Sequence, residues 1–398
     1  MKVAATLKAY CVVIALVIAI GYPTYLYLAD GLIDPAGGEM IGRDFVNYYS
    51  ASQLWMSGSL PTLFWIFDYR DYLASLYGME FTLNWSYPPS YLFFVAPIAL
   101  LPYVLAYVVW MGTGLAIYAT TAAKSIAQTA LSMKTKLMLL LLAPATVVNV
   151  FFGQNGFVTG TLLYLGVRYT SQRPVVAGIC FGLLTIKPQL GFLIPIMLLL
   201  TRQWKTIFVA SGVALSLFVM SGLVFGWQSW VDYFDKAVPF QRHVIEHGGG
   251  LFLHMMPTAY AGGRLLDLPI YLCLLMQLPM TLMAFALTVW LFHKPRGDRA
   301  ATDLLFLICV FMFTPYAFNY DLTALTPAIL GYWATRQAPG ELTQVQRITV
   351  ISLFLLPGLV FAAPVGPLIL IASAVFLYRE IRGSRPSLAH SATRTATA

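Results

Sequence analysis

The sequence predicts an all-α polytopic membrane protein, built as one bundle of about twelve transmembrane helices. Only 10% of its 398 residues are charged, whereas a soluble globular protein carries about 25%. The mean hydropathy is +0.75, and 59% of the residues are hydrophobic. The apolar segments are long and continuous rather than short and alternating, which favours helices over an outer-membrane barrel.

The predicted spans follow these apolar runs, and a helix needs roughly 20 residues to cross the hydrocarbon core. In chain order the runs are 8–28, 103–123, 137–152, 156–171, 174–187, 189–201, 206–226, 268–292, 302–317, 321–335, 347–363 and 365–381. The first begins at Lys8 and lacks a convincing small-residue cleavage site. We therefore interpret it as an uncleaved span rather than a signal peptide.

The positive charges orient these spans. With the N-terminus in the cytoplasm, both termini are cytoplasmic and eighteen of the 24 Lys and Arg residues fall inside. The six that fall outside are Arg43, Arg70, Lys187, Lys236, Arg242 and Arg264. This distribution follows the positive-inside rule. The net charge of +8 is therefore explained by membrane topology, and we expect no nucleic-acid partner.

The first outer loop, 29–102, ends in an apolar segment that is harder to interpret. "YPPSYLFFVAPIALLP" (87–102) is short and contains four prolines. If it crossed the membrane, Lys124, Lys134 and Lys136 would lie outside, against the positive-inside rule. We therefore expect it to lie in the outer interface or to dip into it. A pair of crossings remains the alternative.

The rest of the chain adds a second long outer loop at 227–267 and a polar tail. Residues 383–398 are rich in small polar residues and lack apolar periodicity, so we expect a disordered cytoplasmic tail. Residues 1–382 then form a single integral-membrane domain. The four cysteines all fall in apolar segments, which is typical of buried thiols and not of a disulfide framework or a metal site.

Asp44 stands out among the outer carboxylates. It follows Arg43 directly and precedes an aromatic, helix-like run, "FVNYYSASQLW", that contains Tyr48 and Tyr49. Aromatic density of this kind suits an interfacial belt or equally a platform for a sugar or a lipid headgroup. Asp44 itself is either an acid that stabilises the start of a helix or a functional carboxylate. The residues alone leave these alternatives even.

Three short outer connections carry polar groups in apolar surroundings, and the predicted topology puts them on the same face as Asp44. They are "FFGQNG" (151–156), "TIKPQLG" (185–191) and "PYAFNYDL" (315–322). The polar candidates on them are Gln154, Asn155, Lys187, Tyr320 and Asp321. Polar groups that converge from separate connections indicate a site more strongly than any one of them does.

Several stretches, taken together and in order, resemble glycosyltransferase family 87 of the GT-C superfamily of integral-membrane transferases. They are "RDFVNYYSASQLWMSGSLP" (43–61), "YPPSYLFFVAPIALLPYVLAYVVW" (87–110), "FFGQNGFVTGTLLYLG" (151–166), "RPVVAGICFGLLTIKPQLGFLIP" (173–195) with "RQWK" (202–205), and "TPYAFNYDL" (314–322). The resemblance implies a GT-C-type bundle with juxtamembrane helices in the first outer loop. It implies an inverting transferase whose donor is a polyprenyl-phosphate sugar, with no nucleotide sugar or other cofactor.

The resemblance also implies roles for single residues. An acid in the first outer loop is the general base of such enzymes, and Asp44 occupies that position. Arg43 is expected to orient Asp44 or touch the donor phosphate. Lys187 is either a phosphate ligand or a lysine that snorkels to the interface. Arg264 is the alternative phosphate ligand.

The remaining candidates carry open alternatives. Gln154 and Asn155 bind sugar hydroxyls or cap a helix, and Asp321 contacts substrate or caps the next span. His254 is expected to line the cavity. Because "HVIEHGGGLFLH" is not the zincin pattern, we expect no metal. Actinobacterial mannosyltransferases of the family tend to carry histidines where "PYAFNYD" stands here, so the sugar stays open between mannose and another hexose or pentose.

The predicted function is therefore sugar transfer to a lipid-linked or envelope glycan acceptor, at the outer face of the cytoplasmic membrane and in contact with its lipids. A lipid or solute transporter is the alternative from another class. Transporters usually place ionisable groups near the bilayer midplane, whereas this sequence has them at the span ends. A non-catalytic subunit of an envelope-glycan assembly is the third possibility, and it requires that Asp44 be dispensable.

Overall fold

The structure is a computed structural model that describes residues 33–34, 39–127, 129–294, 296–336 and 342–383. The predicted first span, 8–28, lies outside the described residues, and so does the predicted tail beyond Gly383. The described chain is a bundle of helices apart from one short antiparallel pair, β1 (Ile33–Asp34) with β2 (Glu39–Met40). The all-α prediction is confirmed at this level.

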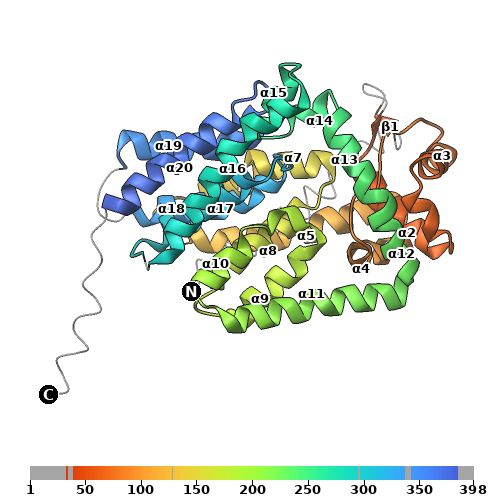
Figure 1. Ribbon diagram of the computed structural model, residues 1–398, viewed down its shortest axis with the longest axis horizontal. Helices are drawn as coiled ribbons and strands as arrows, with labels where there is room; N and C mark the ends of the chain where they lie inside the picture. Colours follow the sequence, from red (N-terminus) through yellow and green to blue (C-terminus); the bar gives the residue numbers. More distant parts are fainter. Residues whose placement is uncertain (1–32, 35–38, 128, 295, 337–341, 384–398) are drawn as a thin grey trace.

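The helices of the first outer loop gather at one end of the bundle, on the right of Figure 1. They are α2 (Phe45–Met56), α3 (Ile66–Tyr77) and α4 (Leu92–Val95). From the second long loop, α12 (Trp227–Asp232) and α13 (Val238–His247) stand at the same end, and α14 (Leu251–His254) and α15 (Ala259–Leu265) continue along the top of the bundle in Figure 1. Both long loops therefore build one end of the molecule.

The body of the bundle consists of helices that run roughly along its long axis. They are α5 (Tyr103–Ile126), α6 (Met133–Leu141), α7 (Pro144–Phe152), α8 (Gly156–Tyr169), α9 (Pro174–Leu183), α10 (Ile194–Leu200), α11 (Trp204–Phe225), α16 (Ile270–His293), α17 (Arg299–Phe313), α18 (Leu325–Arg336), α19 (Gln344–Leu359) and α20 (Gly366–Gly383).

Three helices of the described residues are long and apolar enough to cross a membrane, namely α5, α11 and α16. The pair α6 and α7 makes a fourth if it is one span, bent by 48°. Pro144 explains the bend, because its ring fixes φ and it has no N–H to continue the preceding helix. The other predicted spans fall on shorter helices, or on α20, whose C-terminal part is charged. The count of about twelve spans therefore remains a prediction.

The exposed face of α11 supports a lipid environment. Phe208, Leu215 and Leu223 are 74%, 62% and 65% exposed on a helix that is apolar throughout. Such a surface is stable against lipid chains but not against water.

Residues 87–102 do not form one continuous helix. The prolines divide the segment into a 3₁₀ turn at Pro89–Tyr91, the short α4 and a second 3₁₀ turn at Ala96–Leu100. Even as one helix, Pro89–Leu100 would measure about 18 Å, against a hydrocarbon core of about 30 Å. This length agrees with a segment that does not cross, and its place at the interface stays a prediction.

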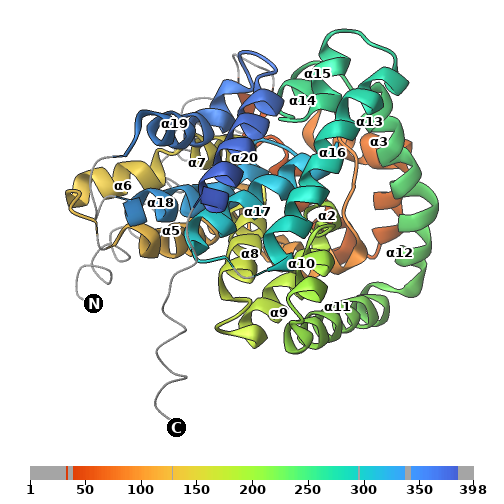
Figure 2. The same ribbon diagram turned by 60° about the vertical axis from the view of Figure 1, so that its left-hand side comes forward.

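The centre of the bundle is α17, which Figure 2 shows among α8, α16, α18 and α20. Its side chains from Leu304 to Met312 are all buried. A helix that is apolar on every face belongs in a core rather than at a surface. The connection that follows it, 314–324, is bonded to the C-terminal half of α7 through Asn149 and to the start of α8 at Gly156. The described cysteines, Cys180, Cys273 and Cys309, are buried thiols as predicted.

Candidate active site

Two glycine turns bring Asp44 and Gln154 together. Gly42 precedes α2 with φ +79, and Gly153 ends α7 with φ +63, a conformation that L side chains rarely adopt. A Cβ at Gly153 would lie 2.3 Å from the Gly42 carbonyl oxygen, so only glycine lets these turns pack. As a result, Gln154 Nε2 donates to Asp44 Oδ2 at 2.5 Å.

Asp44 stands at the N-cap position of α2, but its side chain makes no capping hydrogen bond. It is partly exposed, and the contact to Gln154 joins it to a turn 110 residues away in the sequence. Asp44 therefore makes no side-chain cap bond, and its effect on the start of α2 is limited to its charge. Its geometry is that of a carboxylate held at the meeting point of two outer connections.

The second glycine of "GQNG" admits another connection. A Cβ at Gly156 would lie 2.2 Å from the Tyr320 carbonyl oxygen, so the 314–324 connection packs directly on this backbone. Thr323 Oγ1 donates to the Gly156 carbonyl at 2.6 Å, and Asn149 Nδ2 donates to the Tyr320 carbonyl at 2.9 Å. The motif therefore has a packing reason for its glycines, which place Gln154 and Asn155 between two neighbouring segments.

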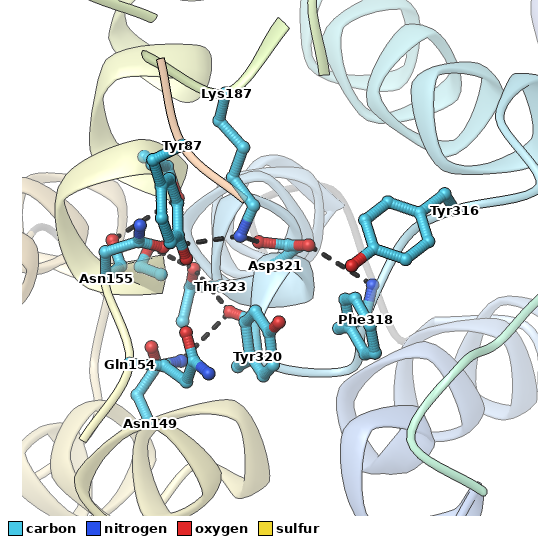
Figure 3. Close-up of polar contacts among 12 residues, drawn as sticks. Tyr87, Asn149, Gln154, Asn155, Lys187, Tyr316, Phe318, Tyr320, Asp321 and Thr323 are labelled. Carbon is cyan, nitrogen blue, oxygen red and sulfur yellow. Dashed lines mark hydrogen bonds and ion pairs between the residues drawn. The ribbon is translucent and has the colours of Figure 1, made fainter. Parts of the chain in front are cut away.

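Lys187 and Asp321 form a buried ion pair in this region (Figure 3). Lys187 Nζ lies 2.5 Å from Asp321 Oδ1, and the two side chains are 3% and 0% exposed. Lys187 also donates to Asn155 Oδ1 at 3.3 Å and lies 4.7 Å from the centre of the Tyr320 ring. Asp321 Oδ2 accepts from the Phe318 backbone N–H at 3.2 Å. Lys187 is thus enclosed and paired rather than extended towards an interface.

Tyrosines connect the Asp44 contact with the ion pair. Tyr48 Oη donates to Gln154 Oε1 at 2.9 Å and lies 2.8 Å from Tyr87 Oη. Tyr91 stacks on Tyr87 with ring centres 4.3 Å apart and accepts from Asn155 Nδ2 at 3.1 Å. Tyr87 and Tyr91 were not among the predicted site residues. The signal that could have found them is "YPPSY", where prolines fix the backbone between two aromatic side chains.

Burial raises the pKa of Tyr48 and of Tyr87 well above the usual value for a phenol. Tyr87 and Tyr91 raise the pKa of Tyr48 further. For Tyr87, the neighbouring Tyr91 and the charges of Asp321 and Asp44 raise the pKa, whereas the hydrogen bond with Tyr48 lowers it. Both phenols therefore remain protonated hydrogen-bond donors at neutral and alkaline pH. Asp44 bonds Gln154, and Asp321 reaches the neighbouring Asn155 through Lys187, so both acids belong to one cluster.

Three further predicted residues, Tyr49, Arg43 and Arg264, have contacts outside the cluster of Asp44, Gln154 and the ion pair. Tyr49 Oη donates to the Leu101 carbonyl at 3.1 Å, which ties α2 to the end of the 87–102 segment. Arg43 has φ +42, and its guanidinium lies 4.5 Å from the centre of the Phe151 ring. Arg264 donates to the carbonyls of Ile245, Glu246 and Gly248, at the C-terminus of α13. Among the described residues, no hydrogen bond links Arg264 to the cluster around Asp44.

His254 ends α14 and is half-buried, and its Nδ1 has no hydrogen-bond partner among the described residues. The next residue, Met255, accepts from the Asn319 backbone N–H at 2.8 Å, so His254 is anchored beside the 314–324 connection. His243 and His247 stack on each other along the exposed α13, 4.3 Å apart. In the described part of the chain, no three His, Cys, Asp or Glu side chains gather as a metal site would require.

Comparison with known proteins decides the family. The family model described as glycosyltransferase family 87 matches residues 85–317, more than half of the chain. The chain belongs to glycosyltransferase family 87. Neither a curated protein nor a solved structure gave a match.

The family 87 match contains much of the geometry described above. It includes Tyr87, Tyr91, the "GQNG" turn and Lys187. It begins after Asp44 and ends before Asp321, so the roles of these two acids rest on geometry and on the resemblance of the flanking stretches. Membership shows a membrane glycosyltransferase, which agrees with the apolar helices, and the nature of the transferred sugar is a separate question.

Proposed function

We propose that this family 87 protein transfers a sugar from a polyprenyl-phosphate donor to a lipid-linked or envelope glycan, with inversion, at the outer face of the cytoplasmic membrane. The observation that carries the proposal is Asp44. It is a partly exposed carboxylate, bonded by a neutral amide, at the end of the bundle where both long loops meet the short connections.

The proposed reaction needs one carboxylate. The acceptor hydroxyl attacks the anomeric carbon from the face opposite the phosphate, a new carbon–oxygen bond forms and the sugar–phosphate bond breaks. Asp44 takes the hydroxyl proton, and the polyprenyl phosphate leaves with the bonding electrons. A positioned base of this kind contributes about 10²–10⁴-fold. A retaining double displacement would require a second carboxylate as nucleophile. Asp321 does not suit that role, because Lys187 and the Phe318 N–H occupy its oxygens.

A groove on the bundle is suited to the hydrocarbon part of the donor. It has a volume of about 660 Å³ and lies along α16, a candidate span, at Tyr271, Leu274 and Leu278. Its other walls include Phe192 and Pro315. In the sequence, Phe192 is close to Lys187, and Pro315 directly precedes Tyr316. Its polar side chains include Gln277, Thr281 and Thr314, which donate to backbone carbonyls. We propose that the isoprenoid chain occupies this groove with its phosphate directed towards the cluster.

The leaving phosphate needs a cation or other donors to stabilise its charge. In this proposal Arg43, next to Asp44 in the chain, is the first candidate. Lys187 contributes instead by joining the connections through its ion pair with Asp321. Tyr48, Tyr87 and Asn155 are buried and hydrogen-bonded within the cluster, so their proposed part is to support the site from behind rather than to form its surface.

The test is transfer by the purified protein from a panel of polyprenyl-phosphate sugars to acceptor lipids extracted from the native envelope. The expected product is one new glycosidic linkage of inverted anomeric configuration, identified by NMR. Asp44→Asn is the matched control, since it keeps the shape of the side chain. Retention of configuration, or transfer from a nucleotide sugar alone, would overturn the proposal.

A further inference from the structure

Gln154 makes two hydrogen bonds whose directions are fixed by chemistry. A carboxylate only accepts hydrogen bonds, so the amide must turn its NH₂ towards Asp44 Oδ2, 2.5 Å away. Its carbonyl oxygen then faces Tyr48 Oη at 2.9 Å, and Tyr48 must donate to it. A buried amide, 5% exposed and bonded at both ends, is poorly placed to bind a sugar hydroxyl.

The direction continues into Tyr87. Tyr48 gives its single proton to Gln154, so at the 2.8 Å contact between the phenols Tyr87 is the donor. The chain of bonds therefore runs one way, from Tyr87 through Tyr48 and Gln154 to Asp44. Bonds aligned in this way polarise one another, which strengthens the last one. Packing holds the chain, because Tyr48 is 1% exposed and lies against Tyr91 and Trp110.

We propose that Gln154 is a positioning residue for the base of the proposed reaction: the Tyr87–Tyr48–Gln154 chain sets the rotation of the Asp44 carboxylate and its basicity. The inference rests on the proposed function for the role of Asp44, whereas the geometry itself does not. The amide donates to the charged form of the carboxylate, which favours that form. These hydrogen bonds therefore keep Asp44 ionised and hold its orientation, and they lower its basicity slightly.

The deciding variant is Gln154→Glu. It keeps the size of the side chain and can still accept from Tyr48, but it sets a second carboxylate against Asp44 at the same distance. Two carboxylates at such a distance share one proton, and the pair releases it only at a higher pH. We expect the acidic limb of the pH–kcat profile to move upward by about one pH unit or more. Gln53→Glu is the matched control, since Gln53 lies on α2, the helix that follows Asp44, and donates to the Ala99 carbonyl instead of to Asp44.

A second variant separates orientation from charge. Gln154→Leu removes both hydrogen bonds and adds no charge. We expect kcat to fall about a hundredfold through misplacement of the base, with KM for the donor nearly unchanged. Its acidic limb should move upward less than that of Gln154→Glu, because only the bond to the charged form is lost. Tyr48→Phe, which keeps the buried ring, should move the limb in the same direction by a smaller amount.

A readout without substrate makes the inference independent of turnover. The carboxyl band of protonated Asp44 can be followed by infrared spectroscopy against pH, with Asp44→Asn identifying it by subtraction. Its midpoint should rise in Gln154→Glu and stay at the wild-type value in Gln53→Glu. Thermal unfolding of each variant in detergent shows which are folded, and if Gln154→Glu does not fold, Tyr48→Phe decides.

The outcomes separate the two proposals. If wild-type protein transfers no sugar but the Asp44 band moves as described, the proposed function fails, and what stands is that the Tyr87–Tyr48–Gln154 chain controls the ionisation of Asp44. If wild-type protein transfers sugar while neither the profile nor the band moves in a folded Gln154→Glu or Tyr48→Phe variant, the positioning role is overturned and the proposed function stands.

Discussion

Asp44 and Asp321 lie at the same end of the bundle and both act on the phenol of Tyr87, yet the protein surrounds them differently. Asp321 is fully buried, with Lys187 on one oxygen and a backbone N–H on the other. Asp44 is partly exposed, and Gln154, a neutral amide, bonds its Oδ2. One acid is neutralised within the protein, and the other remains within reach of solvent.

This difference separates a structural carboxylate from a candidate base. A general base must come within about 3 Å of the proton that it abstracts. A buried ion pair cannot serve in this way without exposing an uncompensated charge, and that cost is large. What Asp321 does well is to join the 314–324 connection, through Lys187, to the connection after α9. The comparison therefore predicts opposite mutational signatures for the two acids.

The largest expected effect is on transfer by Asp44→Asn. The amide keeps the size of the side chain but cannot take the acceptor's proton, so turnover should fall about 10²–10⁴-fold. Thermal stability and donor binding should stay close to wild type, because the asparagine oxygen can still accept from Gln154. All three are measured on one preparation. Turnover above about a tenth of wild type, more than a lost base permits, would remove Asp44 as the base.

The next effect concerns the ion pair. Lys187→Met leaves Asp321 buried without its partner, which should destabilise the protein by about 3–5 kcal/mol. The double variant Lys187→Met with Asp321→Asn should recover most of this loss, because the asparagine oxygen still accepts from the Phe318 N–H. Unfolding in detergent, measured for single and double variants, gives the coupling between them.

Transfer by the double variant sharpens the comparison. If the pair is structural, activity should return together with stability. If Lys187 binds the donor phosphate, as the sequence allowed, the double variant should be stable but still bind donor poorly. Wild-type stability in Lys187→Met alone would show that the pair is not required for folding.

A smaller effect, on the free energy of unfolding, is expected where the Gly42 turn before Asp44 packs against the Gly153 turn before Gln154. Gly153→Ala combines a positive φ with a Cβ 2.3 Å from the Gly42 carbonyl. Gly58→Ala is a matched control, because Gly58 has φ +72 but open space around its Cβ position. The control should lose about 1 kcal/mol, and Gly153→Ala about 1–3 kcal/mol more. Equal losses of unfolding free energy would show that the turns are not in close contact.

Much of this end of the molecule could be predicted from the sequence. Composition and hydropathy identify a helical membrane protein, because the cost of burying polar groups in lipid leaves few alternatives. The positive-inside rule put "GQNG", "TIKPQLG" and "PYAFNYDL" on the same side as Asp44, and the structure brings polar residues from all of these stretches together.

What could not be predicted is which side chain bonds which. Lys187 had two sequence interpretations, phosphate ligand and snorkelling lysine, and the structure shows a third, because its partner lies 134 residues away. Gln154 was expected to bind a sugar hydroxyl or to cap a helix. In the structure its side chain bonds Tyr48 and Asp44 instead. Such choices depend on the packing of distant turns, which periodicity and charge counts do not contain. The bend at Pro144, in contrast, has a local cause that is visible in the sequence.

The smallest expected effect concerns the cation that stabilises the leaving phosphate. Because Lys187 is paired with Asp321, another cation is needed. Arg264 was the alternative, but its guanidinium donates to carbonyls at the C-terminus of α13, where a cation stabilises a helix end. Arg264→Met should therefore cost about 1 kcal/mol of stability and leave donor affinity unchanged. Arg242→Met, on the exposed side of α13 and paired with Glu246, is the control. If Arg264→Met instead loses donor affinity while its stability matches that of the control, Arg264 is the phosphate ligand. The second long loop is then part of the substrate site.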